Sequence, residues 1–198
     1  QGQSILMQNY RQFIHQEYGV RQLLVEHTHF NDPEKREHIR RLLIRAAQQK
    51  TILIVNYNDP VSDEENRKME LAIRRSHGDQ VVECVDNDET AAVIANLVHA
   101  KKLVLMTSTE GIYRDPADPK TLVEQVTAKS MDELEEKVRR LQESCVGASR
   151  AGANGAKAKL EYALKSARQG TMVIIGHARH RLSDLVEGRV ACTRIGLE

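Results

Sequence analysis

Two polar turns that adjoin apolar runs of the sequence carry side chains able to contact a small polar ligand. Asn56 and Asp59 lie in the turn after TILIV, and Asn87 and Asp88 lie in the turn after VVECV. A carboxylate pairs with an ammonium group, and an amide donates to a carboxylate. Each turn alone is also typical of an ordinary Asx turn or of a helix N-cap, which Asp88 would make well. Together the two turns indicate a binding site for an amino acid.

A third turn, TSTEG, follows the apolar run LVLM. Ligands of open α/β sheets bind where a strand ends in a loop. Short hydroxyl side chains and a glycine would let such a ligand lie close to the backbone, although a plain strand-to-loop turn explains the segment equally well by itself. The candidate ligand-binding residues of this segment are Thr107, Ser108, Gly111 and Tyr113.

A glycine-containing loop precedes the last long helical pattern. Gly152 and Gly155 belong to this loop, and Lys159 follows one turn into the helix. Free amide groups and the helix dipole favour anions at such a place, and Lys159 could stabilise a transferring phosphoryl group. Lys157 is better explained as a surface lysine that pairs with Glu161. The GxxxxGK[ST] pattern is absent, so the loop is not a Walker A loop.

The composition argues against several classes of protein. The formal net charge is +1 and aromatic residues make up 4% of the sequence, so nothing indicates a general affinity for nucleic acid or membrane surfaces. No apolar run is long enough to span a bilayer. Cys84, Cys145 and Cys192 are isolated, which favours free thiols in a reducing cytoplasm over disulfides or a zinc site. His177 and His180 lack a further ligand at metal spacing, so a polar loop is favoured there.

The turns must be positioned by an alternation of strands and helices. Such alternation predicts an α/β fold, a three-layer αβα sandwich with a mostly parallel central sheet, as a single domain over residues 1–198. The basic residues of the second helix are typical of a solvated face. The expected strands are 20–27, 51–55, 81–85, 103–106, 121–126, 172–176 and, at an edge, 190–197. The expected helices are 4–18, a helix capped by residues 31–33, 63–75, 90–99, 130–142 and 157–169.

The order of these segments resembles the amino-acid kinase superfamily, and within it the glutamate 5-kinases. GQSILMQNYRQFIHQEYGV is similar to the GQ..LM..Y......YG segment of that family, and ILIVNYNDPVS is similar to P-I-I-N-E-N-D-x-V, with Tyr57 in place of Glu. VDNDETAAVIANLVHAKKLVLMTSTEGIY is similar to GDND-x-L-S-A followed by L-L-T-D-x-x-G-L-Y, with Ser108 where Asp is usual. AGANGAKAKLEYALKSARQG is similar to G-T-G-G-M-x-T-K-L and its helix.

The resemblance implies a role for each candidate residue. ATP would bind at residues 107–113 and at the loop 152–159, Mg²⁺ would bridge its phosphates, and Lys159 would stabilise the transferring phosphoryl group. The implied reaction is the phosphorylation of L-glutamate to γ-glutamyl phosphate, the first step towards proline, in a cytoplasmic homo-oligomer. A first strand, a phosphate-binding lysine and a Gly/Ser loop would precede Gln1. The substrate-binding residues implied are Asn56, Asp59, Asn87 and Asp88.

Two alternatives remain beside this interpretation. One is another kinase of the superfamily that acts on aspartate, uridylate or carbamate. The other is a catalytically inactive homologue that binds a metabolite or a partner. Asn154, Ala156 and Ala158 replace the Gly, Met and Thr of the family's glycine loop, which favours the second alternative.

Overall fold

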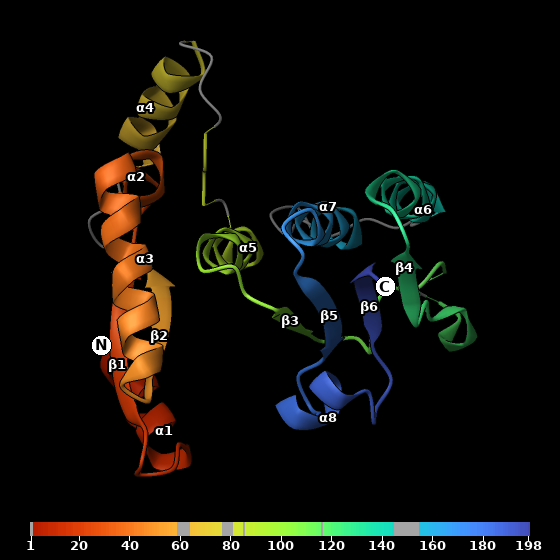
Figure 1. Cartoon of the computed structure of the whole chain (residues 1–198), viewed down its shortest axis with the longest axis horizontal. Helices are drawn as coiled ribbons and strands as arrows, with labels where there is room; N and C mark the ends of the chain where they lie inside the picture. The colour runs from red at the N-terminus through yellow and green to blue at the C-terminus, as the bar shows by residue number, and fades with distance from the viewer. Residues whose placement is uncertain (1, 59–63, 77–80, 85, 116, 145–154) are drawn as a thin grey trace. The chain divides into compact units, whose positions relative to one another are not determined.

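The computed structural model describes residues 2–58, 64–76, 81–84, 86–115, 117–144 and 155–198. Their contacts divide the chain into two compact units, Gln1–Asn87 and Asp88–Glu198. Both units combine helices with parallel strand pairs (Figure 1), so the expected mixed α/β fold is confirmed. The single kinase-like domain over residues 1–198 stays a prediction.

The first unit is built on two parallel strands. Strands β1 and β2 pair in register from Gly19↔Thr51 to Val25↔Tyr57. The helix α3 lies within the connection between them, as in the usual strand–helix–strand crossover of parallel strands. The elements are α1 Gly2–Phe13, β1 Gly19–Val25, α2 His27–Asn31, α3 Pro33–Gln48, β2 Thr51–Tyr57 and α4 Glu64–Ser76.

The start of α3 follows from its local sequence. The Asp32 side chain accepts hydrogen bonds from the amides of Glu34 and Lys35 at 2.9 and 3.0 Å, and Pro33 occupies the first helical position. These backbone hydrogen bonds, led by that from Lys35, lower the pKa of Asp32 below its ordinary value. The predicted cap is therefore confirmed. The five-residue helix α2 was not predicted, because it is too short to show a helical period.

The second unit contains a four-stranded sheet in the order β3-β5-β6-β4. The pairs β3/β5 and β4/β6 are parallel, and β5/β6 is antiparallel. The elements are α5 Asn87–Leu97, which begins at the boundary residue, β3 Lys102–Thr107, η2 Pro119–Thr121, β4 Gln125–Ala128, α6 Met131–Ser144, α7 Ala156–Ala167, β5 Met172–His177, α8 Leu182–Glu187 and β6 Thr193–Leu197.

Helices cover both faces of this sheet (Figure 1), and the alternation along β5 shows why. Val173 and Ile175 are fully buried in the core that includes α6 and α7, whereas Ile174 is buried against Leu185 of α8 on the other face. Side chains two apart on a strand share a face. The predicted apolar face of α7 is confirmed, since Leu160 is 0% exposed.

Two strand predictions were wrong. The C-terminal strand was expected at an edge, but β6 lies between β5 and β4. The polar residues of β6 favoured an edge position, but its residues Thr193 and Ile195 are fully buried. Residues 81–84 were expected to be strand-like and are not a strand. Instead the Asn31 side chain binds the amide and carbonyl of Val82 at 2.8 and 2.7 Å, and Cys84 has a φ of 52°, which interrupts an extended chain.

Candidate functional site

The carboxyl ends of β3 and β5 lie side by side in the second unit. Thr107 and His177 are partners in the parallel pair, and the amide of Ala178 donates to the carbonyl of Thr107 at 2.8 Å. The turn after β3 is held by Thr107, whose hydroxyl accepts from the amide of Thr109 at 2.9 Å. Ser108 is exposed at the tip of this turn. Parallel strands thus present two adjacent loops at one edge of the sheet, where α/β proteins bind ligands.

Gly111, a predicted ligand-binding residue, is also required by the fold. A Cβ atom at this position would lie 2.4 Å from Oγ1 of Thr193, which no real contact permits. That hydroxyl accepts from the amide of Ile112 at 2.8 Å and donates to the carbonyl of Val123 at 2.6 Å. Tyr113 follows in an isolated bridge with Leu122 and is half-buried.

A charged cluster that the sequence did not reveal connects the two loops. Glu110 of the first loop binds Arg179 and His180 of the loop after β5, with 2.6 Å between the Glu110 carboxylate and Nε2 of His180. The Nδ1 atom of His177 accepts from the amide of Arg179 at 3.0 Å. The only sequence signal was the acidic residue in TSTEG and the basic composition of residues 177–181.

Two predicted residues, Asp88 and Lys159, are in direct contact. The Lys159 ammonium forms an ion pair with the Asp88 carboxylate, and their side chains are 23% and 24% exposed. Asp88 was expected to be the N-cap of this helix, but α5 begins at Asn87 and Asp88 is its second residue. Its carboxylate still lies in the first turn, where the helix dipole favours a negative charge.

The start of α7 offers an anion-binding geometry beside this ion pair. Gly155 is the N-cap of α7 and provides no side-chain hydrogen bond to the first turn. Lys159 lies one turn in, where its amide donates to the Gly155 carbonyl at 3.2 Å. An uncapped helix start and a lysine together favour a phosphate group. Lys157 is exposed, as expected. The predicted ion pair between Lys157 and Glu161 does not form in the described structure.

The remaining candidate residues belong to the first unit or are not described. Asn56 lies within β2 and not in the turn that was expected, because its backbone pairs with Leu24. Its side-chain oxygen accepts from the amide of Tyr57 at 2.9 Å. Asn87 is exposed at the start of α5. The predicted residues Asp59 and Gly152 lie outside the described residues, as does the position of Cys145.

A chain of polar side chains lies next to Asn56 in the first unit, buried at His27 and Tyr57 and exposed at Glu70. Nδ1 of His27 is 3.0 Å from the Tyr57 hydroxyl, and Nε2 of His27 is 3.1 Å from the Glu70 carboxylate. The chain joins α2, the end of β2 and α4. The chain was not predicted from the sequence, because its contacts join residues 30 and 43 positions apart. The contact fixes the ring of Tyr57, the residue that replaces Glu in the NYND segment.

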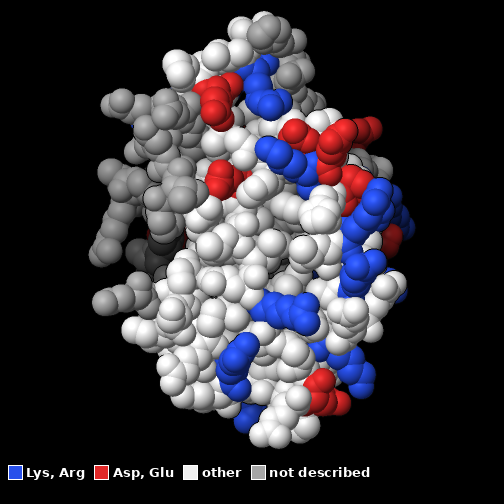
Figure 2. Space-filling view, turned by 90° about the vertical axis from the view of Figure 1, so that its left-hand side faces the viewer, with Lys and Arg blue, Asp and Glu red and all other residues white. Residues whose placement is uncertain are grey.

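The basic face of α3 is solvated, as predicted, since Lys35, Arg36, Arg41 and Arg45 are exposed. Arg40 and Arg41 bind Glu37 at 2.7 and 2.9 Å, and these two hydrogen bonds lower the pKa of Glu37 to about 2. Figure 2, which shows the side drawn at the left of Figure 1, has acidic groups beside many of its basic ones.

The parts of the chain that the structure describes contain neither a membrane-spanning helix nor a group of metal-ligand side chains. No helix there has the length and apolarity needed to cross a bilayer. Nor do three or more His, Cys, Asp or Glu side chains gather there as ligands for a metal ion.

Comparisons with known proteins show what the chain is similar to. The chain is 31% identical to glutamate 5-kinase of Geobacillus thermodenitrificans (strain NG80-2) over 99% of its length and 48% of the relative's. It is 29% identical to glutamate 5-kinase 1 of Bacillus subtilis (strain 168) over 98% of its length and 49% of that protein. The chain therefore spans about half the length of the curated relatives it matches.

The structural likeness extends to a carbamate kinase. The structure of carbamate kinase from Giardia lamblia bound to AMP-PNP matches with a TM-score of 0.53 at 16% identity, over 83% of this chain and 45% of that one. At this identity the match shows a shared fold. The family model of the amino acid kinases matches residues 1–177. The chain belongs to the amino acid kinase family.

Proposed function

We propose that this chain takes part in an ATP-dependent phosphorylation of the carboxyl group of an amino acid, with L-glutamate as the substrate and γ-glutamyl phosphate as the product. The observation that carries the proposal is the contact between Lys159 and Asp88 beside the uncapped start of α7. Family membership supports phosphoryl transfer, and the names of the curated relatives support glutamate and hence a place in proline biosynthesis.

Lys159 would act on the transferring phosphoryl group. Phosphoryl transfer needs positive charge on the equatorial oxygens and little covalent chemistry. The Lys159 side chain is only 23% exposed and its ammonium pairs with Asp88, so the ammonium is held in place before a substrate arrives. The amides of the first turn of α7 would add positive potential at the same place.

The loops after β3 and β5 would bind the nucleotide. Thr107, Ser108, Gly111 and Tyr113 would contribute from the end of β3 and the loop after it, and Gly155 would approach the phosphates from the start of α7. Gly152, which lies outside the described residues, is proposed to bind the nucleotide as well. The contacts of Glu110 with Arg179 and His180 hold the two loops together, which supports a preformed site. The carbamate kinase of similar fold was solved with AMP-PNP bound, which supports ATP as the nucleotide.

Mg²⁺ fits the residues present as a partner of the nucleotide. Kinases hold this ion through one or two carboxylates together with the substrate phosphates, and a cage made of protein ligands alone is not needed. Asp88 is the carboxylate of the candidate site that lies next to the phosphoryl-binding lysine. The ion would neutralise charge on the phosphates, while Lys159 and the amides of α7 orient them.

Asn56, Asp59, Asn87 and Asp88 would bind the amino acid. The amides would donate to its carboxylate and the carboxylates would accept from its ammonium group. The Tyr57 hydroxyl is held by His27 at 3.0 Å, so the side chain that replaces Glu in this segment has a fixed orientation next to Asn56.

Two further proposals concern the state of the protein in the cell. Apolar side chains on α1 and α4 are exposed, among them Phe13 at 87%, Ile5 at 60% and Met69 at 59%, which supports a homo-oligomer formed through these helices. Cys192 is a buried free cysteine, which agrees with a reducing cytoplasm.

ATP turnover with different acceptors tests the proposed function. The full-length protein should release ADP when L-glutamate is added, and less with L-aspartate, UMP or carbamate. Lys159→Ala should abolish this turnover while far-UV circular dichroism stays unchanged. Lys157→Ala, at an exposed position two residues away, should have a mild effect. Stimulation by another acceptor would replace glutamate as the substrate. ATP binding without turnover of any acceptor would favour the inactive homologue.

A further inference from the structure

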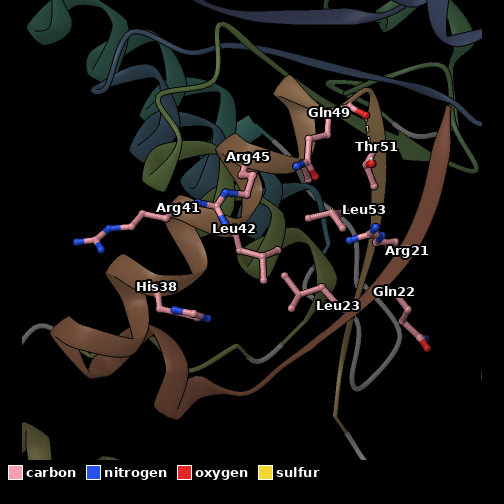
Figure 3. A pocket seen from close by; sticks show the side chains of 11 residues that line it. Arg21, Gln22, Leu23, His38, Arg41, Leu42, Arg45, Gln49, Thr51 and Leu53 are labelled. Carbon is pink, nitrogen blue, oxygen red and sulfur yellow. Dashed lines mark hydrogen bonds between the residues drawn. The ribbon is translucent and has the colours of Figure 1, made fainter. Parts of the chain in front are cut away.

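A pocket of about 410 Å³ lies between α3 and the two strands of the first unit. Its walls combine apolar and basic side chains. Leu23 and Leu53 from the strands and Leu42 from α3 are half-buried and face the space, while Arg21 and Arg45 border it (Figure 3). Small-molecule sites typically have volumes of roughly 300–1,000 Å³ with mostly apolar walls and a few polar groups. The pocket has these properties.

The backbone explains why these side chains meet. Arg21 and Leu53 are direct partners in the parallel pair, and Leu23 lies two residues after Arg21, so all three share one face of the sheet. Leu42 and Arg45 are three residues apart and share one side of α3. Figure 3 shows that side of the helix facing the strands, with His38 directed into the same space.

Arg41 of α3 also lines the pocket, but Arg21 and Arg45 differ from it in their contacts. Arg40 and Arg41 are held by Glu37. Within the described part of the chain, by contrast, the side chains of Arg21 and Arg45 form no ion pair and no hydrogen bond. Two unpaired guanidinium groups beside an apolar surface match a ligand that has an anionic head and an apolar body.

We propose that this pocket binds a small carboxylate with an aliphatic body, whose head pairs with Arg21 and Arg45 and whose body covers Leu23, Leu42 and Leu53. The site is separate from Asn56, which lies on the same strand and is proposed to bind the amino acid. Leu53 and Asn56 are three residues apart on β2, which corresponds to about 10 Å along a strand. A ligand here therefore does not occupy the position of the substrate.

Isothermal titration calorimetry of the full-length protein with octanoate, 1-octanol and acetate tests the proposal. Octanoate should bind saturably. Octanol, which lacks the charge, and acetate, which lacks the body, should each bind at least about tenfold more weakly, because each loses one of the two kinds of contact. Arg21→Gln and Arg45→Gln should each weaken octanoate binding about tenfold. Both arginines are exposed, so circular dichroism should show an unchanged fold.

Arg36→Gln is the matched control. Arg36 is an exposed arginine of the same helix that does not line the pocket, so its loss changes the net charge equally and should leave octanoate binding unchanged. Equal weakening by Arg36→Gln, equal affinity for octanol and octanoate, or no saturable binding would overturn the proposal. Self-association that Leu53→Gln disrupts would also overturn it, since the pocket would then be an interface between copies.

Discussion

We expect the ion pair between Asp88 and Lys159 to contribute measurably to the free energy of unfolding. An exposed ion pair contributes about 0.2–1 kcal/mol, and breaking a fully buried one costs roughly 3–5 kcal/mol. The two side chains are 24% and 23% exposed and lie between these limits. We therefore expect Asp88→Asn and Lys159→Met each to lower the free energy of unfolding by roughly 1–2 kcal/mol, because each leaves a partly buried partner unpaired.

A double-mutant cycle isolates the contact. The double variant should be less destabilised than the sum of the two single variants, with a coupling energy of about 1 kcal/mol. Urea unfolding followed by circular dichroism gives the free energies, and amide exchange of α7 assigns them to the second unit. Lys157→Met, at an exposed position of the same helix, should change stability by less than about 0.5 kcal/mol. Additivity within about 0.3 kcal/mol would refute the contact.

Three other substitutions test the fold around the site. Gly111→Ala places a Cβ 2.4 Å from the fully buried Thr193 hydroxyl and should destabilise the protein by about 1–3 kcal/mol in thermal unfolding; an unchanged melting temperature would contradict this close packing. Leu160→Ala, at a position that is 0% exposed, should cost about 2–5 kcal/mol in urea unfolding, and a value near zero would place α7 outside the core. The lowered pKa of Asp32 stabilises the folded state above the ordinary carboxyl pKa, and this stabilisation is lost as the pH falls through the lowered value. In Asp32→Asn the free energy of unfolding should therefore fall less between pH 7 and pH 3 than in the unmodified protein. An unaltered pH profile would contradict the cap.

Local features of the fold could be predicted because they depend on neighbouring residues. The cap at Asp32 needs only the amides two and three residues later. The apolar period of α7 predicted its buried face, of which Leu160 and Leu164 are 0% and 1% exposed. The direct contact between Asp88 and Lys159 was not predicted. Resemblance to a family predicted only that both residues belong to one site.

Features that depend on distant pairing could not be predicted. The end of β2 at Tyr57 is set by its partner Val25 and not by the polar residues of the turn. The contact of Glu110 with His180 joins residues 70 positions apart, and that of His27 with Glu70 joins residues 43 positions apart. No period or spacing in one sequence encodes such contacts.

The position of β6 imposes an order on the folding of the second unit during synthesis. In the described sheet β4 and β5 do not pair with each other, and each pairs with β6. β4 leaves the ribosome early but can join the sheet only after Thr193–Leu197 has followed. At about 5–20 residues per second this interval lasts roughly 3–13 s. Throughout it β4 offers unpaired edges to other nascent chains, so the late strand leaves β4 exposed to aggregation during this interval.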